Sequence, residues 1–178
     1  MAVWVALLRG VNVGGVRLAM ADLRAAALGL GWQGARSYIA SGNLVFAAEG
    51  EAPGLAAALQ DALRNSTTLT IPVLVIAAAR LRAVVATCPF DPVAGKDVHG
   101  FLLWSPAVID WPLCESLRLA SEALVAGDGV VWLHAPEGVG RSKLAERMHR
   151  VVTGTQITAR NLNTLRALVE MLDAGQAG

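Results

Sequence analysis

Residues 36–48 read RSYIASGNLVFAA, and this stretch decides the fold that the sequence predicts. Two short runs of strand-forming residues, 36–40 and 43–48, are separated by Ser41 and Gly42, which are typical of a tight turn. The pattern therefore predicts a β-hairpin. Helical patterns lie on both sides of it, so the hairpin is the middle of a larger unit.

The elements around this hairpin follow the order βαββαβ. β-branched and aromatic residues predict a strand from Ala2 to Arg9, and helical spacing predicts a helix from Met20 to Leu30. A second helix opens at Pro53, because proline is favoured in a first helical turn, and a strand follows from Val73 to Ala77. This order is the split βαβ pattern of ferredoxin-like domains, in which two helices cover one face of a four-stranded antiparallel sheet.

The rest of the chain repeats this order. The turn Gly127-Asp128-Gly129 between two apolar runs is a strong hairpin signal. The expected elements are a connecting helix at Ala79–Ala86, a strand at Val98–Trp104, a helix at Pro112–Leu119, strands at Ala123–Ala126 and Val130–His134, a helix at Ser142–Val152, a strand at Gln156–Ala159, and a terminal helix that carries Leu165, Leu168 and Leu172.

We therefore expect an α+β fold of two tandem ferredoxin-like (βαββαβ) halves with mainly antiparallel sheets and a C-terminal helix. The N-terminal half is expected at 1–79, a connecting helix and loop at 80–97, and the C-terminal half with the terminal helix at 98–178. Segments 45–50 and 131–138 resemble each other, and each leads into a leucine-striped helix. Internal duplication explains this likeness, and so does the similar composition of two apolar strand-to-helix joints; both explanations stay open.

The composition is that of a folded protein without a broad charged surface. Of the 178 residues 54% are apolar and 16% are charged, which suffices for a substantial core. The formal charge of +1, from 15 Lys+Arg against 14 Asp+Glu, does not favour nucleic acid as a partner. No run approaches the roughly 18 apolar residues of a membrane span. We expect a cytoplasmic protein in which Cys88 and Cys114 are unpaired packing residues.

Standard catalytic patterns are mostly absent from the sequence. Segment 137–143, EGVGRSK, does not supply the GxxxxGK[ST] order of a phosphate-binding loop, and segment 10–15 lacks the GxGxxG spacing. His99, His134 and His149 are scattered, without companions at ligand spacing, so no metal and no cofactor is expected. The sequence leaves open whether the protein is an enzyme.

The glycine-rich segment RGVNVGG is the first candidate binding loop. It contains Arg9, Asn12, Gly14 and Gly15. Glycines permit positive φ angles and leave backbone N–H groups free to face a ligand, so such a loop can hold an anion. A flexible connector whose glycines only satisfy turn geometry explains the same residues.

Segment 140–143 is the second candidate. Arg141 and Lys143, on either side of Ser142, place two cations in the first turn of a predicted helix, where the helix dipole disfavours each by roughly 0.3 to 1 kcal/mol. A bound phosphate or carboxylate would compensate this cost, and so would Glu137 without any ligand.

The third candidate comprises Arg160, Asn161 and Asn163, at the predicted start of the last helix. One asparagine is a natural N-cap, and two are more than a single cap needs. Ser41 and Asn43 are a similar case, because a tight hairpin explains both residues without a ligand.

The same stretches resemble the signatures of an uncharacterised, mainly bacterial family, domain of unknown function 1697. The similar segments are 6–15 (ALLRGVNVGG), 38–46 (YIASGNLVF), 140–144 (GRSKL) and 158–164 (TARNLNT), in this order along nearly the whole chain. The resemblance implies an α+β fold with ferredoxin-like halves and brings no activity, cofactor or catalytic residue. Family members usually have lysines after the glycine pair, where this chain has only Arg17, and a tryptophan where Leu162 stands.

Two functions remain in competition. The first is a protein, enzymatic or not, that binds a small anionic or phosphorylated ligand through its glycine-rich and Arg/Asn loops. The second is a non-enzymatic module for protein interaction or homo-oligomerisation, because ferredoxin-like sheets have open edges. Binding of single-stranded nucleic acid is less favoured, since the strand aromatics lie among apolar neighbours and the RNP1 pattern is missing.

Overall fold

The computed structural model describes residues 1–175, and these residues form two compact units. The first unit contains residues 1–82 together with the segment from Leu168, and the second contains residues 83–167. Two helices, α3 (Ala78–Ala86) and α7 (Leu162–Ala174), contribute residues to both units. The domain boundaries expected from the sequence stay a prediction.

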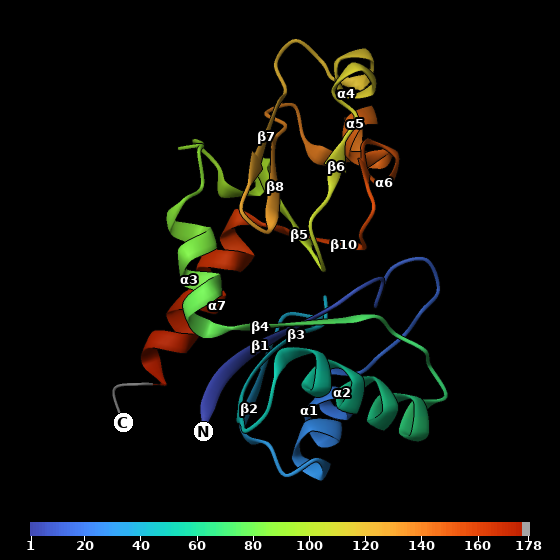
Figure 1. Cartoon of the computed structure of the whole chain (residues 1–178), viewed down its shortest axis with the longest axis vertical. Helices are drawn as coiled ribbons and strands as arrows, with labels where there is room; N and C mark the ends of the chain where they lie inside the picture. The colour runs from blue at the N-terminus through green and yellow to red at the C-terminus, as the bar shows by residue number, and fades with distance from the viewer. Residues whose placement is uncertain (176–178) are drawn as a thin grey trace. The chain divides into compact units, whose positions relative to one another are not determined.

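The first unit is a four-stranded sheet with two helices on one face (Figure 1). Its strands follow the order β2-β3-β1-β4, and all neighbours are antiparallel. The elements are β1 (Ala2–Leu8), α1 (Met20–Gly29), β2 (Gln33–Tyr38), β3 (Asn43–Ala48), α2 (Ala52–Thr67) and β4 (Val73–Ala77).

The core of the first unit follows from the strand period of two. Alternate residues of β1 and β3, such as Ala6, Leu8 and Phe46, belong to one buried cluster with the leucine stripe of α2. Trp32 stacks on Phe46 with ring centroids 4.0 Å apart and an angle of 9° between the planes. Burying each large apolar side chain stabilises the fold by about 1.5 to 3 kcal/mol before the entropy of ordering is subtracted.

The second unit contains another four-stranded antiparallel sheet, in the order β10-β5-β8-β7, and a separate pair of short strands, β6 and β9. Its strands are β5 (Val98–Leu103), β6 (Val108–Ile109), β7 (Ala123–Gly127), β8 (Val130–His134), β9 (Val152–Thr153) and β10 (Ile157–Asn161). Its helices are α4 (Trp111–Leu117), α5 (Lys143–Glu146) and α6 (Met148–Val151), with 3₁₀ turns at Gly95–Asp97 and Val139–Arg141.

The mixed α+β class with antiparallel sheets, expected from the sequence, is confirmed. The single helix expected at Ser142–Val152 is wrong, because the chain forms α5 and α6 with a break at Arg147 (φ −103°, ψ 17°). The residues Val151, Val152 and Thr153 are β-branched and favour an extended chain, which leads directly into β9. None of the helices within residues 1–175 has both the length and the apolar character that crossing a membrane requires.

Candidate functional site

The first unit brings two of the predicted segments together: the glycine loop, residues 10–17, and the hairpin turn, residues 39–42. Asn12 joins them, because its side-chain amide donates to the carbonyl of Ala40 at 2.6 Å and to that of Leu18 at 2.9 Å. Its Oδ1 accepts the N–H of Leu18 at 3.1 Å. Asn12 therefore holds the loop in place, and both of its amide hydrogens have protein acceptors.

The tip of the glycine loop presents backbone to solvent. Gly14 and Gly15 have φ angles of +60° and +95°, and a Cβ added at either position would meet no atom within 4 Å. Across residues 1–175, the N–H groups of Val13, Gly14 and Gly15 donate to no protein acceptor. Three successive amides of this kind are available to an anion.

Arg9 precedes this loop in the sequence and Arg17 is its last residue. The side chains of Arg9 and Arg17 are both exposed. The backbone N–H of Arg9 donates to the carbonyl of Pro72 at 2.9 Å, which fixes the start of the loop against the segment that enters β4. The loop therefore has two guanidinium groups within its own unit.

The hairpin turn is explained by its own packing. Gly42 has φ +77°, and a Cβ there would lie 2.6 Å from Cγ2 of Val11 and 2.7 Å from Cβ of Leu8. Asn43 is fully buried and donates to the carbonyl of Tyr38 at 3.0 Å and to Oγ of Ser41 at 2.8 Å. The tight-hairpin explanation of Ser41 and Asn43 thus accounts for these contacts.

In the second unit, segment 140–143 leads into the four-residue helix α5, whose first residue is Lys143. Ser142 is buried, and its Oγ accepts the N–H of Ala145 at 2.9 Å, so it is the N-cap. Arg141 and Lys143 are exposed, and neither forms an ion pair with any residue in the described range. Glu137 accepts instead from Oγ of Ser121 at 2.7 Å, so it does not neutralise the two cations.

The segment before α7 contains a buried cation. Arg160 on β10 is only 7% exposed and donates to Oγ1 of Thr158 at 3.0 Å and to the carbonyl of Ala159 at 2.8 Å. Burial lowers the pKa of Arg160 to about 10, so the guanidinium remains charged at neutral pH.

The two asparagines of this segment have separate structural contacts. Asn161 is the N-cap, because its Oδ1 accepts the N–H of Thr164 at 2.9 Å. The side chain of Asn163 lies so close to Gly95 that a Cβ at Gly95 would overlap its Oδ1. Both residues are therefore explained by packing of the second unit.

The second unit also contains a pocket of about 240 Å³, between α4 and the start of β7, that was not predicted from the sequence. It is lined by Trp111, Cys114, Glu115, Arg118 and Glu122, with residues 123 and 124 of the strand. The only hint in the sequence is the spacing of Glu115 and Arg118, three residues apart on one helix face.

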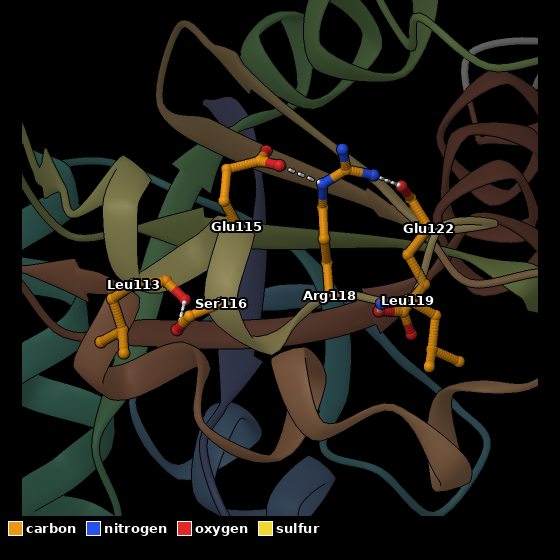
Figure 2. A network of polar contacts seen from close by, with 6 residues as sticks. All are labelled: Leu113, Glu115, Ser116, Arg118, Leu119 and Glu122. Atoms are coloured by element: carbon orange, nitrogen blue, oxygen red, sulfur yellow. Dashed lines mark hydrogen bonds and ion pairs between the residues drawn. The ribbon is translucent and has the colours of Figure 1, made fainter.

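Arg118 organises the polar side of this pocket. Its Nε donates to Glu115 at 2.8 Å and its Nη1 to the backbone carbonyl of Glu122 at 3.0 Å, as Figure 2 shows. The carboxylate of Glu122, which is only 3% exposed, accepts the N–H of Leu119 at 2.9 Å. Burial is the main cause that raises the pKa of the Cys114 thiol, so the thiol is protonated at neutral pH.

No group of three or more His, Cys, Asp or Glu side chains within residues 1–175 is arranged to hold a metal ion. His99 lies on β5 with a buried Nδ1 that has no hydrogen-bond partner there.

Comparison with known proteins adds a family and a fold. A family model described as "Protein of unknown function (DUF1697)" matches residues 1–132. The solved structure of the conserved bacterial protein SP0830 from Streptococcus pneumoniae is similar, with a TM-score of 0.75 and 24% sequence identity over 97% of this chain and 99% of that chain. At this identity the likeness shows the fold alone. No curated protein matches the chain.

Proposed function

The chain belongs to the DUF1697 family, a family of proteins of unknown function, and we propose that it binds a small anionic ligand at the glycine loop. The ligand class is a phosphate or phosphorylated small molecule. The proposal concerns binding, and whether a reaction follows is a separate question.

The observation that carries the proposal is the row of three unpaired amides at Val13, Gly14 and Gly15 in the described structure. Successive N–H groups without protein acceptors provide the positive partial charge that suits an anion. The positive φ angles of both glycines support this, since a residue with a Cβ resists that conformation. Arg17, and Arg9 at the start of the loop, add the charge that a phosphate requires.

Asn12, Ser41 and Asn43 have a supporting role in this proposal. Asn12 fixes the loop against the hairpin turn, and Asn43 fixes the turn. A loop whose backbone is held before the ligand arrives loses less conformational entropy on binding. These side chains therefore shape the site rather than touch the anion.

The second-unit residues form a separate candidate. Arg141 and Lys143 are exposed cations without ion-pair partners in the described residues, and Ser142, Asn161 and Asn163 support the backbone near them or near α7. An Arg141→Ala variant tests this candidate independently of the glycine loop.

The test is a thermal-shift titration with inorganic phosphate, nucleotides and sugar phosphates at constant ionic strength. A ligand at a hundred times its Kd should stabilise the protein by about 2.7 kcal/mol. We expect the stabilisation to fall in Gly15→Ala, which disfavours the open amide row, and in Arg17→Gln, which removes one charge.

Matched controls separate this site from general effects. Gly31→Ala changes another open glycine of the same unit, with φ +78°, and Arg150→Gln removes another exposed charge. Both should keep the full ligand-induced shift. The proposal is contradicted if no anion raises the melting temperature. It is also contradicted if Gly15→Ala and Arg17→Gln leave the ligand-induced rise unchanged.

We also propose that the two units are ferredoxin-like halves related by duplication. If the four strands of each sheet are numbered in chain order, both sheets have the strand order 2-3-1-4. In the second unit these four strands are β5, β7, β8 and β10, and the short strands β6 and β9 are not counted. Helices connect the first strand to the second and the third to the fourth in each unit. This shared connectivity supports duplication more strongly than the short sequence likeness does.

A cytoplasmic location is part of the same proposal. Cys88 and Cys114 are both free thiols, which is typical of a reducing compartment. Cell fractionation with a tagged chain tests it, and recovery from an oxidising compartment would contradict it.

A further inference from the structure

The outer strand of the second sheet has an unprotected edge. Strand β7 is last in the order β10-β5-β8-β7 and, within the described residues, pairs only with β8. Its residues, ALVAG, include no charge and no proline, and its register with β8 runs without a bulge. Residues 125–127 are exposed.

Proteins usually protect such an edge. Strand β2, at one edge of the first sheet, has a register shift between Gln33 and Arg36 and carries a charged side chain. Bulges, charges and prolines are the devices that prevent a further strand from pairing. Strand β7 has none of these devices, so its outer N–H and C=O groups are available to another extended chain.

The pocket beside α4 lies directly against this edge. Ala123 and Leu124 of β7 line it together with Trp111 and Glu115 of α4 and with Arg118, the residue that follows this helix. Its volume of about 240 Å³ is below the roughly 300 to 1,000 Å³ of pockets that enclose a whole small ligand. The size suits one side chain of a strand added to β7.

We propose that β7 and this pocket bind an extended peptide segment of a partner protein, which adds to the sheet as a fifth strand and places a lysine or arginine side chain in the pocket. Main-chain hydrogen bonds along an edge supply affinity in this mode of recognition, and a pocket beside the edge supplies specificity.

The charge of the pocket selects a basic side chain. Glu115 and Glu122 supply two carboxylates and Arg118 one guanidinium, so the pocket has a net charge of −1. Arg118 is already paired with Glu115 at 2.8 Å, whereas the largely buried Glu122 carboxylate accepts the Leu119 N–H and has no ion-pair partner in the described residues, so its charge attracts a cation that enters the pocket (Figure 2). Trp111 is 45% exposed and lines the pocket, and an aromatic ring attracts a cation that stacks on it.

A second copy of this chain fits the edge less well than a basic peptide. Antiparallel pairing of β7 with itself about Val125 sets Glu122 opposite Asp128 of the other copy, and it does so twice. Like charges directly opposite each other destabilise a strand pair. The strand ALVAG also has no basic residue to place in the pocket.

The test uses the full chain and a fluorescent, end-capped peptide of sequence Thr-Val-Lys-Val-Thr in a buffer without phosphate. Replacing the central lysine by norleucine should weaken binding about tenfold, and replacing it by glutamate should abolish it. N-methylation of alternate peptide amides should also abolish binding, because it removes the main-chain hydrogen bonds. Amide NMR shifts on adding the lysine peptide should concentrate at residues 122–127.

Variants of the chain sharpen the result. Glu122→Gln keeps an acceptor for the Leu119 N–H and should lose the tenfold preference for lysine over norleucine, while Glu146→Gln, an exposed carboxylate on α5, should keep it. Trp111→Ala, at an exposed position, should weaken the lysine peptide severalfold and serves if Glu122→Gln fails to fold.

Three results would overturn the proposal: no binding of the lysine peptide at millimolar concentration, equal binding of the glutamate peptide, or NMR shifts away from β7. A dimer that forms on concentration and protects the β7 amides would assign the edge to a second copy instead. None of these results depends on the anion titration, since the two sites lie in different units.

Discussion

At the scale of single residues, Gly42 is the position in the hairpin turn where adding a side chain should be most destabilising. A Cβ would lie 2.6 Å from Val11 and 2.7 Å from Leu8, and φ is +77°. Gly42→Ala should therefore lower the free energy of unfolding by about 2 to 4 kcal/mol, from overpacking and backbone strain together. Chemical denaturation of the variant and the parent protein measures this change in the free energy of unfolding. Gly10→Ala, at φ +74° in open space, is the control and should cost only about 1 to 2 kcal/mol; equal losses would contradict the packing explanation.

His99 is a second single residue with a testable effect, because its burial should make the free energy of unfolding depend on pH. Burial lowers the pKa of His99 below its ordinary value of 6.5, and the opposing effect of Asp97 is smaller. The unfolded chain binds a proton near pH 6.5 and the folded chain only at lower pH, so the unfolded state binds more protons between the two pKa values. The free energy of unfolding should thus be fully maintained above pH 6.5 and fall as the pH drops through this window.

Denaturation series at several pH values check this expectation. His99→Gln should flatten the fall in unfolding free energy, and His149→Gln, at an exposed position, should leave it unchanged. A His99→Gln protein with the same pH slope as the parent would contradict the role given to burial.

Single residues also show what the sequence predicts about a site. An N-cap at Asn161 or Asn163 was predictable, because a local motif specifies it, and in the structure Asn161 is the cap. The contact of Asn12 with Ala40 was not, since it joins residues 28 positions apart, and nothing in a local pattern indicates such a pair. The pocket beside α4 was missed for the same reason: its wall comes from a helix and a strand edge that only the folded chain brings together.

At the scale of elements, the cap of α5 decides whether so short a helix forms. Ser142 satisfies the N–H of Ala145 in a helix of four residues, Lys143–Glu146. Ser142→Ala should lower the free energy of unfolding by about 1 kcal/mol, because it removes the cap and leaves that donor without its acceptor. Ser142→Asp, which retains an acceptor, should recover part of this loss. Arg141→Ala, the control, should change the free energy of unfolding little. If denaturation shows no loss of unfolding free energy in Ser142→Ala, the capping role is contradicted.

Elements also differ in how well a local pattern predicts them. Strand β4 has the predicted bounds, Val73–Ala77, because a short run rich in β-branched residues directly after Pro72 has few alternatives. Strands β6 and β9 have two residues each, too few for any alternation to be recognised, and they exist because they pair with each other. The break between α5 and α6 was not predictable either, because Leu144, Met148 and Val151 share one core at the i, i+4, i+7 spacing of a single helix.

At the scale of the whole molecule, the pairing of β2 with β3 and of β7 with β8 was predictable from the two hairpins, whereas the grouping of the terminal helix was not. The sequence presents α7 as one apolar stripe, yet the chain from Leu168 belongs with the first unit. A stripe reports that a helix face is buried and does not report which partner buries it.

Leu172 makes this grouping testable. It is 2% exposed and lines a pocket of about 220 Å³ with Val3 and Val45 of the first sheet, and Arg36 of β2 donates to the carbonyl of Met171 at 2.7 Å. Leu172→Ala should lower the free energy of unfolding by about 2 to 5 kcal/mol. Hydrogen exchange should locate the loss in β2 and β3, because those strands lose apolar cover.

The neighbouring residue supplies the control for this change. Asp173→Ala removes only a partly exposed ion pair with Arg82, at 2.9 Å, and should cost less than about 1 kcal/mol. If Leu172→Ala instead accelerated exchange in β5 and β8 and left β2 and β3 protected, the end of α7 would belong energetically to the second unit. The faster exchange of first-unit strands is the expected result, since the buried contacts of Leu172 lie there.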